Sequence, residues 1–151
     1  MVYLAPRLES HTMHISATVR NARGAHHVRV ATGSAARSLS IPAREGGYGS
    51  GINGGEFLML ALATCYCNDL YREAERLGVS VESVEVEANA DFEGVGLAAR
   101  NIQYRARVVS DASEADVARL LRETDAVAEV HNTIRAGAAV SLGPWGDDSA
   151  I

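Results

Sequence analysis

The sequence predicts a single α+β domain in which the helices are segregated from a largely antiparallel sheet. Its 151 residues are the length of one ordinary domain that can bury a core without disulfides. Several short segments alternate apolar and polar residues as strands do, and two longer segments have apolar residues at helical spacing. No repeat, linker or second domain is visible. We therefore expect one domain over residues 1–151, with a core at about 13–142 and a polar tail at 143–151.

The first part of the chain predicts a meander of strands. Apolar residues alternate with more polar ones from 13 to 19, and a turn signal follows at 21–24. Valines at 28 and 30 continue the pattern, and residues 38–41 add a short β-prone run before a proline. We expect these strands to pair with one another.

A long helix is expected after the glycine-rich segment 45–51. Asn53 is a good N-cap, Glu56 stands at the capping-box position, and Gly78 is the expected stop. Almost every residue from 57 to 67 is apolar, so we expect the first half of this helix to be buried on all sides. One small sheet and one partner helix cannot cover that surface, which favours a homodimer.

The next elements predict a hairpin. Valines in 79–86 indicate a strand with a bulge, and residues 102–108 indicate a second strand. We expect the two to pair across a turn at 94–96, with Arg105 and Arg107 on the solvated face.

A second helix and a final strand complete the prediction. Ser113 with Asp116 resembles an N-cap, and apolar residues recur at helical spacing from there to about His131. The run 138–142 is expected to form a last strand.

The composition excludes several classes of function. A net charge of −5 and a pI near 5.5 argue against a nucleic-acid binder, which needs a basic surface. All 14 residues counted as Lys+Arg are arginine, so chemistry that requires a lysine is excluded. No apolar run reaches the ~18 residues of a membrane span, and residues 1–10 do not resemble a signal peptide. We expect a cytoplasmic protein with no membrane partner.

Two local motifs resemble those of the OsmC-like family. The segment 51–66, GINGGEFLMLALATCY, is similar to a helix-opening signature, Gly-x-Asn-Pro-Glu-Glu-Leu leading to Ala-x-Cys. The segment 128–133, AEVHNT, resembles a second signature that begins Cys-Pro-Val. The expected order of elements agrees over about 13–142. The resemblance implies an OsmC-like fold, with antiparallel sheets wrapped around two central helices, in an intertwined homodimer with two sites at the subunit interface.

The resemblance also implies a thiol chemistry. In active members a cysteine on the first long helix attacks the O–O bond of a hydroperoxide and becomes a sulfenic acid, which the cysteine of the second signature resolves as a disulfide. The attacking position is Cys65 here. The resolving position falls on Ala128, and the position of a tuning glutamate falls on Gly55.

The remaining parts of the family's site have only partial matches. Glu56 stands next to the missing glutamate, but at about 100° per residue it lies on the opposite face of the helix from Cys65. Arg44 and Arg23 are the nearest matches to the arginine that stabilises the thiolate. Cys67 lies about 200° around the helix from Cys65, so a disulfide between the two would require unwinding.

Two functions from different classes fit these residues. One is a thiol-dependent reductase of organic hydroperoxides in which Cys65 acts alone and an external thiol completes the cycle. The other is a non-peroxidatic dimer that binds a small apolar or reactive ligand at the subunit interface; a purely structural dimer is a third reading. No cofactor or metal is implied.

Each singled-out side chain also has a plainer interpretation. Cys65 can be a small buried hydrophobe, and Cys67 is expected to be structural. His131 is interpreted as a helix C-terminal residue, with proton donation near the site as the alternative. His26 and His27 are interpreted as strand-edge or surface residues, because no third metal ligand stands at a diagnostic spacing.

Overall fold

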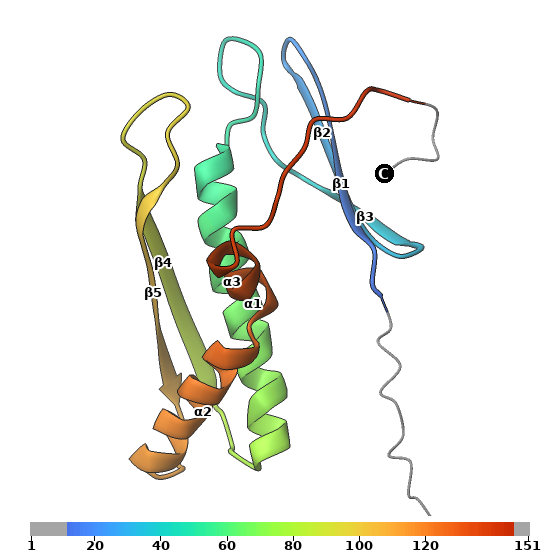
Figure 1. Cartoon of the computed structure of the whole chain (residues 1–151). Coiled ribbons are helices and arrows are strands. Elements are labelled where there is room, and N and C mark those ends of the chain that lie inside the picture. The colour runs from blue at the N-terminus through green and yellow to red at the C-terminus, as the bar shows by residue number, and fades with distance from the viewer. Residues whose placement is uncertain (1–11, 147–151) are drawn as a thin grey trace, which may run out of the picture. The chain divides into compact units, whose positions relative to one another are not determined.

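The computed structural model describes residues 12–146 and has an α+β fold with two antiparallel sheets and three helices (Figure 1). The predicted fold class is confirmed. By its contacts the chain divides into two compact units, one containing residues 12–52 with 145–146 and the other containing 53–144. The expected absence of a signal peptide concerns residues outside the described part. No helix of that part combines the length and apolarity needed to cross a membrane.

The first unit is a three-stranded meander of β1 (Ile15–Ala22), β2 (Ala25–Thr32) and β3 (Ala35–Leu39), paired in that order. The predicted strands are confirmed. The third strand begins earlier than expected, because the ladder with β2 already starts at the Thr32–Ala35 pair. Gly24 and Gly33 close the two tight turns with positive φ angles, which glycine adopts without steric cost.

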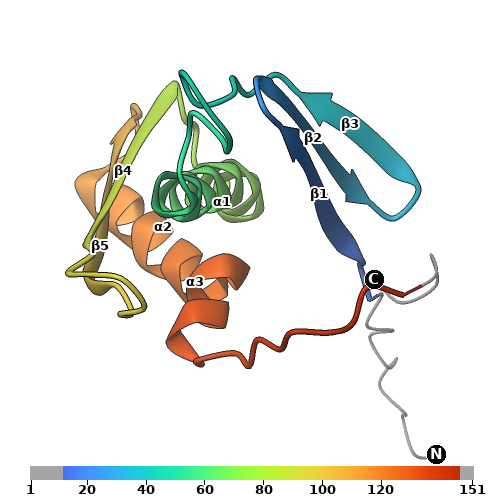
Figure 2. The same ribbon diagram turned by 90° about the horizontal axis from the view of Figure 1, so that it is seen from above.

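The second unit begins with α1 (Gly54–Leu77), whose ends follow the sequence signals. Asn53 and Glu56 form a reciprocal capping box, and Gly78 ends the helix in the left-handed conformation. The hairpin of β4 (Ser83–Asp91) and β5 (Arg100–Val109) packs on one side of α1 (Figures 1 and 2). The chain then forms α2 (Glu114–Val127) and α3 (Glu129–Arg135), which also pack on α1.

The core of the second unit lies where α1 meets α2 and the hairpin. Leu70 and Leu120 are fully buried, and the apolar face of the hairpin packs against them. The opposite face of the hairpin carries cross-strand ion pairs, Arg105 with Glu87 at 2.5 Å and Arg107 with Glu85. The predicted pairing of the hairpin and its solvated arginine face are therefore confirmed.

Several sequence predictions for the second unit are wrong. Strand β4 begins only at Ser83, and its irregularity lies between Asn89 and Asp91 rather than among the valines. The predicted last strand at 138–142 has no strand partner among the described residues, and Val140 is 96% exposed.

The prediction for the second helical segment also needs correction. The segment expected to be one helix is broken at Ala128, whose ψ of 102° is not helical. In the single chain, Leu60 in the first half of α1 is 58% exposed, so burial of this half on all sides stays a prediction that depends on the expected second copy.

Candidate functional site

The candidate nucleophile Cys65 lies on α1 one turn before Asp69. At this i, i+4 spacing the two side chains share a face of the helix. The half-buried thiol donates a hydrogen bond to Asp69, with Sγ 3.5 Å from Oδ2. The candidate nucleophile is thus in direct contact with a carboxylate.

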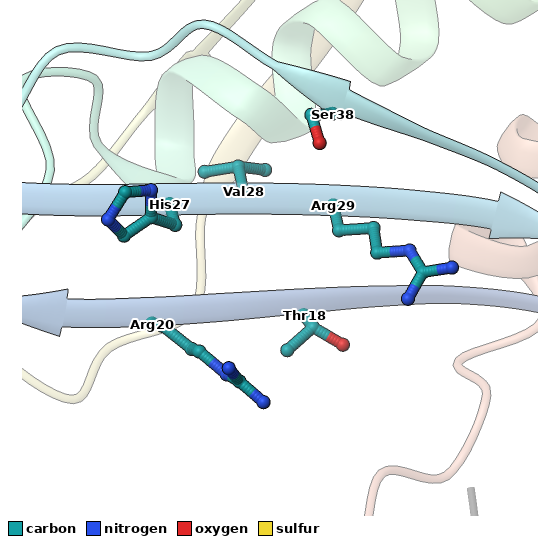
Figure 3. Close-up of a pocket in the computed structure, with 6 residues that line it drawn as sticks. All are labelled: Thr18, Arg20, His27, Val28, Arg29 and Ser38. Carbon is teal, nitrogen blue, oxygen red and sulfur yellow. The ribbon is translucent and has the colours of Figure 1, made fainter.

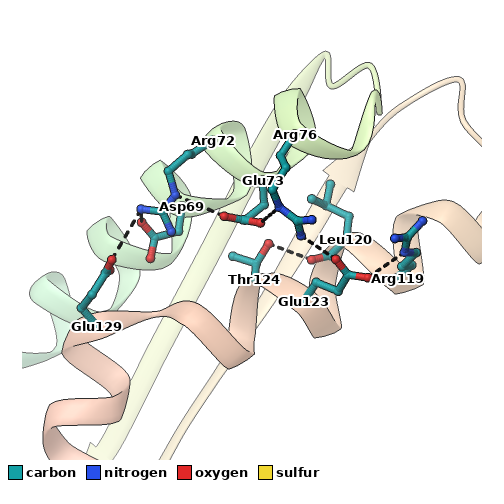
Figure 4. Close-up of polar contacts among 9 residues, drawn as sticks. All are labelled: Asp69, Arg72, Glu73, Arg76, Arg119, Leu120, Glu123, Thr124 and Glu129. Atoms are coloured by element: carbon teal, nitrogen blue, oxygen red, sulfur yellow. Dashed lines mark hydrogen bonds and ion pairs between the residues drawn. The ribbon is translucent and has the colours of Figure 1, made fainter. Parts of the chain in front are cut away.

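Asp69 is held by an arginine on the same helix (Figure 4). Only 5% of Asp69 is exposed, and its Oδ1 lies 2.9 Å from Nη1 of Arg72. The same guanidinium nitrogen lies 3.6 Å from Oε1 of Glu129, the first residue of α3. Arg72 therefore joins the carboxylates of two helices beside the thiol.

The second motif segment meets Cys65 at the start of α3. The backbone N–H of Val130 lies close enough to the Cys65 sulfur to lower the pKa of the thiol, and the Glu129 carboxylate lies close to the same thiol. Ala128, at the position of the resolving cysteine, is fully buried immediately before these residues. The structure therefore brings together the two segments that carry the family resemblance.

The electrostatics keep the thiol protonated. Burial raises the pKa of the Cys65 thiol, and the neighbouring charges of Asp69 and Glu129 raise it further, whereas the Val130 N–H lowers it. Burial also raises the pKa of Asp69, and Glu129 adds to this effect while Arg72 opposes it. A reactive cysteine usually has a cation beside its sulfur, whereas here two carboxylates lie nearest.

The same three residues include the atoms that a metal ion would require. The sulfur of Cys65 and one carboxylate oxygen from each of Asp69 and Glu129 lie within 4.8 Å of one another. However, the guanidinium of Arg72 already pairs with both carboxylates, so its positive charge opposes a bound cation. The geometry favours acid–base chemistry at the sulfur over metal binding.

Glu56 is engaged in capping the helix. Its Oε2 accepts a hydrogen bond from the Asn53 backbone N–H at 2.8 Å. A side chain at Gly55, the position of the family's glutamate, would meet the Phe92 ring, because a Cβ there would lie 3.1 Å from the nearest ring carbon. A glutamate at residue 55 would therefore require Phe92 to move.

The two candidate arginines belong to one corner of the first unit. Arg23 lies in the β1–β2 turn, and Arg44 lies in the loop that follows β3. The Asn21 side chain bonds both the N–H and the C=O of Gly49, and the Gly24 N–H donates to the Gly47 C=O. These bonds join the turn and the loop, so the structure brings the two arginine-bearing segments together.

Of the other singled-out residues, His131 differs most from its prediction. It lies in the first turn of α3 rather than at a helix C-terminus and is only 3% exposed. Neither ring nitrogen has a hydrogen-bond partner in the described chain, and its ring packs 4.4 Å from that of Tyr104 and 5.8 Å from that of Tyr66, measured between ring centroids.

The remaining residues that the sequence analysis singled out are His26, His27 and Cys67. His27 is exposed, and His26 bonds Asn21 from the central strand of the sheet rather than from an edge. Cys67 is half-buried and, like Cys65, a free thiol.

Sequence reasoning missed the acidic surroundings of Cys65. Asp69 and Arg72 stand four and seven residues after the cysteine, a spacing that places them on its face of the helix. Asp69 and Arg72 could therefore have been identified from the sequence. Glu129 and Val130 could not, because their proximity to Cys65 depends on how α3 packs against α1.

Comparison with known proteins gives one family and a consistent set of structures. The profile of the family described as OsmC-like protein matches residues 47–143. An OsmC-like protein from Mycoplasma pneumoniae has a similar structure at 15% identity, with a TM-score of 0.59 over 83% of this chain and 89% of that chain. No curated protein matches the chain.

Two further solved structures share the fold. One is an organic hydroperoxide resistance protein OsmC from Legionella pneumophila, with 19% identity and a TM-score of 0.54 over 83% of this chain and 90% of that one. The other is an organic hydroperoxide resistance protein from Elizabethkingia anophelis, with 17% identity and a TM-score of 0.58 over 83% and 91%. At these identities the structures support the fold alone.

Proposed function

The chain belongs to the OsmC-like family, and we propose on that basis that it is a thiol-dependent reductase of organic hydroperoxides with Cys65 as its nucleophile. Two of the structures that share its fold are named organic hydroperoxide resistance proteins. The observation that best supports the proposal is the hydrogen bond from Cys65 to Asp69 at 3.5 Å, and the Val130 N–H lies close to the same sulfur. The Asp69 carboxylate can accept the thiol proton, and the Val130 N–H can donate a hydrogen bond at the sulfur once it is oxidised.

The proposed step follows from these contacts. The Cys65 sulfur attacks the terminal oxygen of a hydroperoxide ROOH, an S–O bond forms, and the O–O bond breaks with its electron pair leaving on RO⁻. Asp69 accepts the thiol proton and passes it to the departing alkoxide, which leaves as the alcohol. The product at Cys65 is a sulfenic acid.

The cycle requires an external reductant. Ala128 offers no sulfur, so the sulfenic acid is reduced by two equivalents of an external thiol, which release water and a disulfide and restore the Cys65 thiol. This need for free thiol suits the reducing cytoplasm. Because burial and, after it, the nearby carboxylates raise the pKa of Cys65, we expect a rate that is slow at neutral pH and rises as the pH increases.

The proposed site still needs the family's arginine at the sulfur, because the nearby Arg72 pairs with Asp69 and Glu129 instead. Arg23 and Arg44 are proposed as thiolate partners on the family resemblance, and the bonds between the β1–β2 turn and the following loop hold their segments in one corner. If one of them acts at the sulfur, its replacement by glutamine lowers the peroxide rate. Glutamine at the other arginine should leave the rate unchanged, so comparison of Arg23→Gln with Arg44→Gln identifies the thiolate partner.

We propose that the protein works as a homodimer. Leu60 is 58% exposed in the middle of the apolar half of α1, and a second copy would cover it. Light scattering at micromolar concentration should give twice the 16.0 kDa mass of the chain. A monomeric mass would contradict the dimer without touching the role of Cys65.

A second function is favoured by one specific observation. Burial and two neighbouring carboxylates raise the pKa of the thiol, which is the reverse of what a fast nucleophile needs. The corresponding hypothesis is a non-peroxidatic protein that binds a small apolar or reactive ligand at the subunit interface.

Steady-state peroxide consumption separates the two functions. The assay follows cumene hydroperoxide in the presence of excess small thiol for the native chain, Cys65→Ser and the matched control Cys67→Ser. The reductase predicts consumption that is lost in Cys65→Ser and kept in Cys67→Ser. Consumption that survives Cys65→Ser rejects a reductase that uses Cys65. No consumption above the background in the native chain rejects the reductase and favours the binding protein.

A further inference from the structure

The N-terminal sheet has one face that is polar and basic. In an antiparallel ladder, residues directly opposite each other point to the same side. Thr18 pairs with Arg29, Arg20 pairs with His27, and Arg29 pairs with Ser38. Since residues two apart on a strand also share a side, these five side chains lie on one face (Figure 3).

This basic face is hollowed. A cavity of about 310 Å³, open to solvent, is lined by Thr18, Arg20, His27, Val28, Arg29 and Ser38. A second hollow of about 210 Å³ adjoins it and shares Thr18 and Arg29 with the first. Arg29 stands on the central strand, so it contributes to both hollows.

The charge of this region is opposite to that of the whole chain. The protein has a net charge of −5, yet residues 10–44 contain no Asp or Glu. Five arginines occur in the same stretch, at positions 20, 23, 29, 37 and 44. A segment this basic in an acidic protein is unlike an ordinary solvated surface, where both signs are mixed.

Within residues 12–146, the arginines of the basic face also have no acidic partner. The ion pairs formed among residues 12–146 all lie in the second unit, from Arg72 to Arg135, and none includes Arg20 or Arg29. A guanidinium without a carboxylate keeps its planar set of N–H donors available for an incoming oxyanion.

We propose that this face binds a small ligand through a phosphate or carboxylate group. Arg29 is the central donor, with the hydroxyls of Thr18 and Ser38 directly across the ladder on its two sides. Arg20 and His27 form a second pair of nitrogen donors next to it. Guanidinium forks match the spacing of oxygen atoms in both oxyanions, and a sheet holds the donors in fixed register.

The proposal is independent of Cys65. All residues of the basic face belong to β1, β2 and β3 of the first unit, whereas the thiol and its contacts belong to the second. Loss of peroxide activity in Cys65→Ser therefore has no bearing on it.

The test is a titration of the ¹⁵N-labelled full chain, followed by ¹H–¹⁵N spectra. Pyrophosphate and citrate are added separately, and sodium chloride holds the ionic strength constant. The proposal predicts saturable shifts at the amides of Thr18, Arg29 and Ser38. Saturation by pyrophosphate alone identifies a phosphate ligand, and saturation by citrate alone identifies a carboxylate ligand. Saturation by neither rejects the proposal.

Matched variants separate a specific site from general charge. Arg29→Gln should weaken binding at least tenfold, on the order of 1.4 kcal/mol. Arg37→Gln removes the same charge from the same sheet, but Arg37 pairs with Val30 on the opposite face, so binding should be unchanged. Equal weakening by both would overturn the proposal. If Arg29→Gln does not fold, Arg20→Gln takes its place in the comparison with Arg37→Gln. Arg20 lies on the same face, on the outer strand β1.

Discussion

The thiol of Cys65 donates a hydrogen bond to the carboxylate of Asp69, its neighbour one helical turn along α1, across 3.5 Å. The contact gives the proposed nucleophile a proton acceptor, and it also places a negative charge where a thiolate would form. Both consequences follow from the same two atoms. The contact therefore makes Asp69 the first residue at which to test the chemistry of Cys65.

Asp69→Asn should make Cys65 more reactive toward an alkylating reagent. Removing the carboxylate charge lowers the pKa of the thiol, because this charge contributes to raising it in the native protein. If the charge interaction between Asp69 and the thiolate is worth about 1 kcal/mol, iodoacetamide should react about fivefold faster at pH 7.

The matched control for this measurement is Glu75→Gln. It removes an exposed negative charge from the same helix and should leave the rate unchanged. If Asp69 carries the proton in the peroxide step, oxidation by hydroperoxide should not accelerate in proportion to alkylation. A slower alkylation of Asp69→Asn would contradict the electrostatic argument.

Ala128→Cys should restore a two-cysteine cycle. Residue 128 is fully buried just before Glu129 and Val130, which already contact Cys65. After one equivalent of peroxide, the variant should lose two hydrogens in mass and cease to react with a sulfenate trap. Val127→Cys is the control, because Val127, the last residue of α2, is 41% exposed. A persistent sulfenic acid in Ala128→Cys would show that the segment does not present a sulfur to Cys65.

The stability of the fold should fall between neutral and mildly acidic pH because of His131. Burial lowers the pKa of His131, and the positive charge of Arg135 lowers it further, while Asp125 raises it. The unfolded chain therefore binds the proton more readily than the folded one, so stability is fully present above about pH 6.5 and declines as the pH falls below that value.

Urea denaturation at a series of pH values measures this decline. The variant His131→Phe keeps a ring beside Tyr66 and Tyr104 but cannot take up a proton. Its denaturation midpoint should change less with pH between 7.5 and 5.5 than that of the native chain. An equal dependence in both proteins would exclude His131 as the cause.

Glu56 should matter for stability and not for the reaction. Glu56→Ala removes the acceptor for the Asn53 N–H and should cost on the order of 1 kcal/mol in the free energy of unfolding. Glu56→Gln keeps an oxygen there and should restore most of that loss. Peroxide and alkylation rates should equal those of the native chain in both variants. A slower peroxide reaction of Glu56→Gln would indicate that Glu56 takes part in the reaction.

Local signals explain which elements could be predicted from the sequence. Asn53, Glu56 and Gly78 set the ends of α1 through contacts within a few residues, and alternation set the strands of both sheets. The break at Ala128 carries no such signal, because neither glycine nor proline marks it and apolar spacing continues through it. The run 138–142 alternates like a strand, but an alternating run forms a strand only where another strand pairs with it.

The candidate site could be predicted only in part for a similar reason. The motif on α1 identified Cys65, and helical spacing from that cysteine could have identified Asp69. The Glu129 carboxylate and the Val130 N–H approach the sulfur from another helix, 64 and 65 residues away in the sequence. Contacts over such a separation depend on packing, which no local pattern encodes.

The most direct test of the account is intact-mass spectrometry after one equivalent of cumene hydroperoxide, with a sulfenate trap present. The account predicts a trapped adduct that maps to Cys65, is absent from Cys65→Ser and is retained in Cys67→Ser. The absence of an adduct in the native protein, or an adduct that persists in Cys65→Ser, would contradict the proposed role of Cys65.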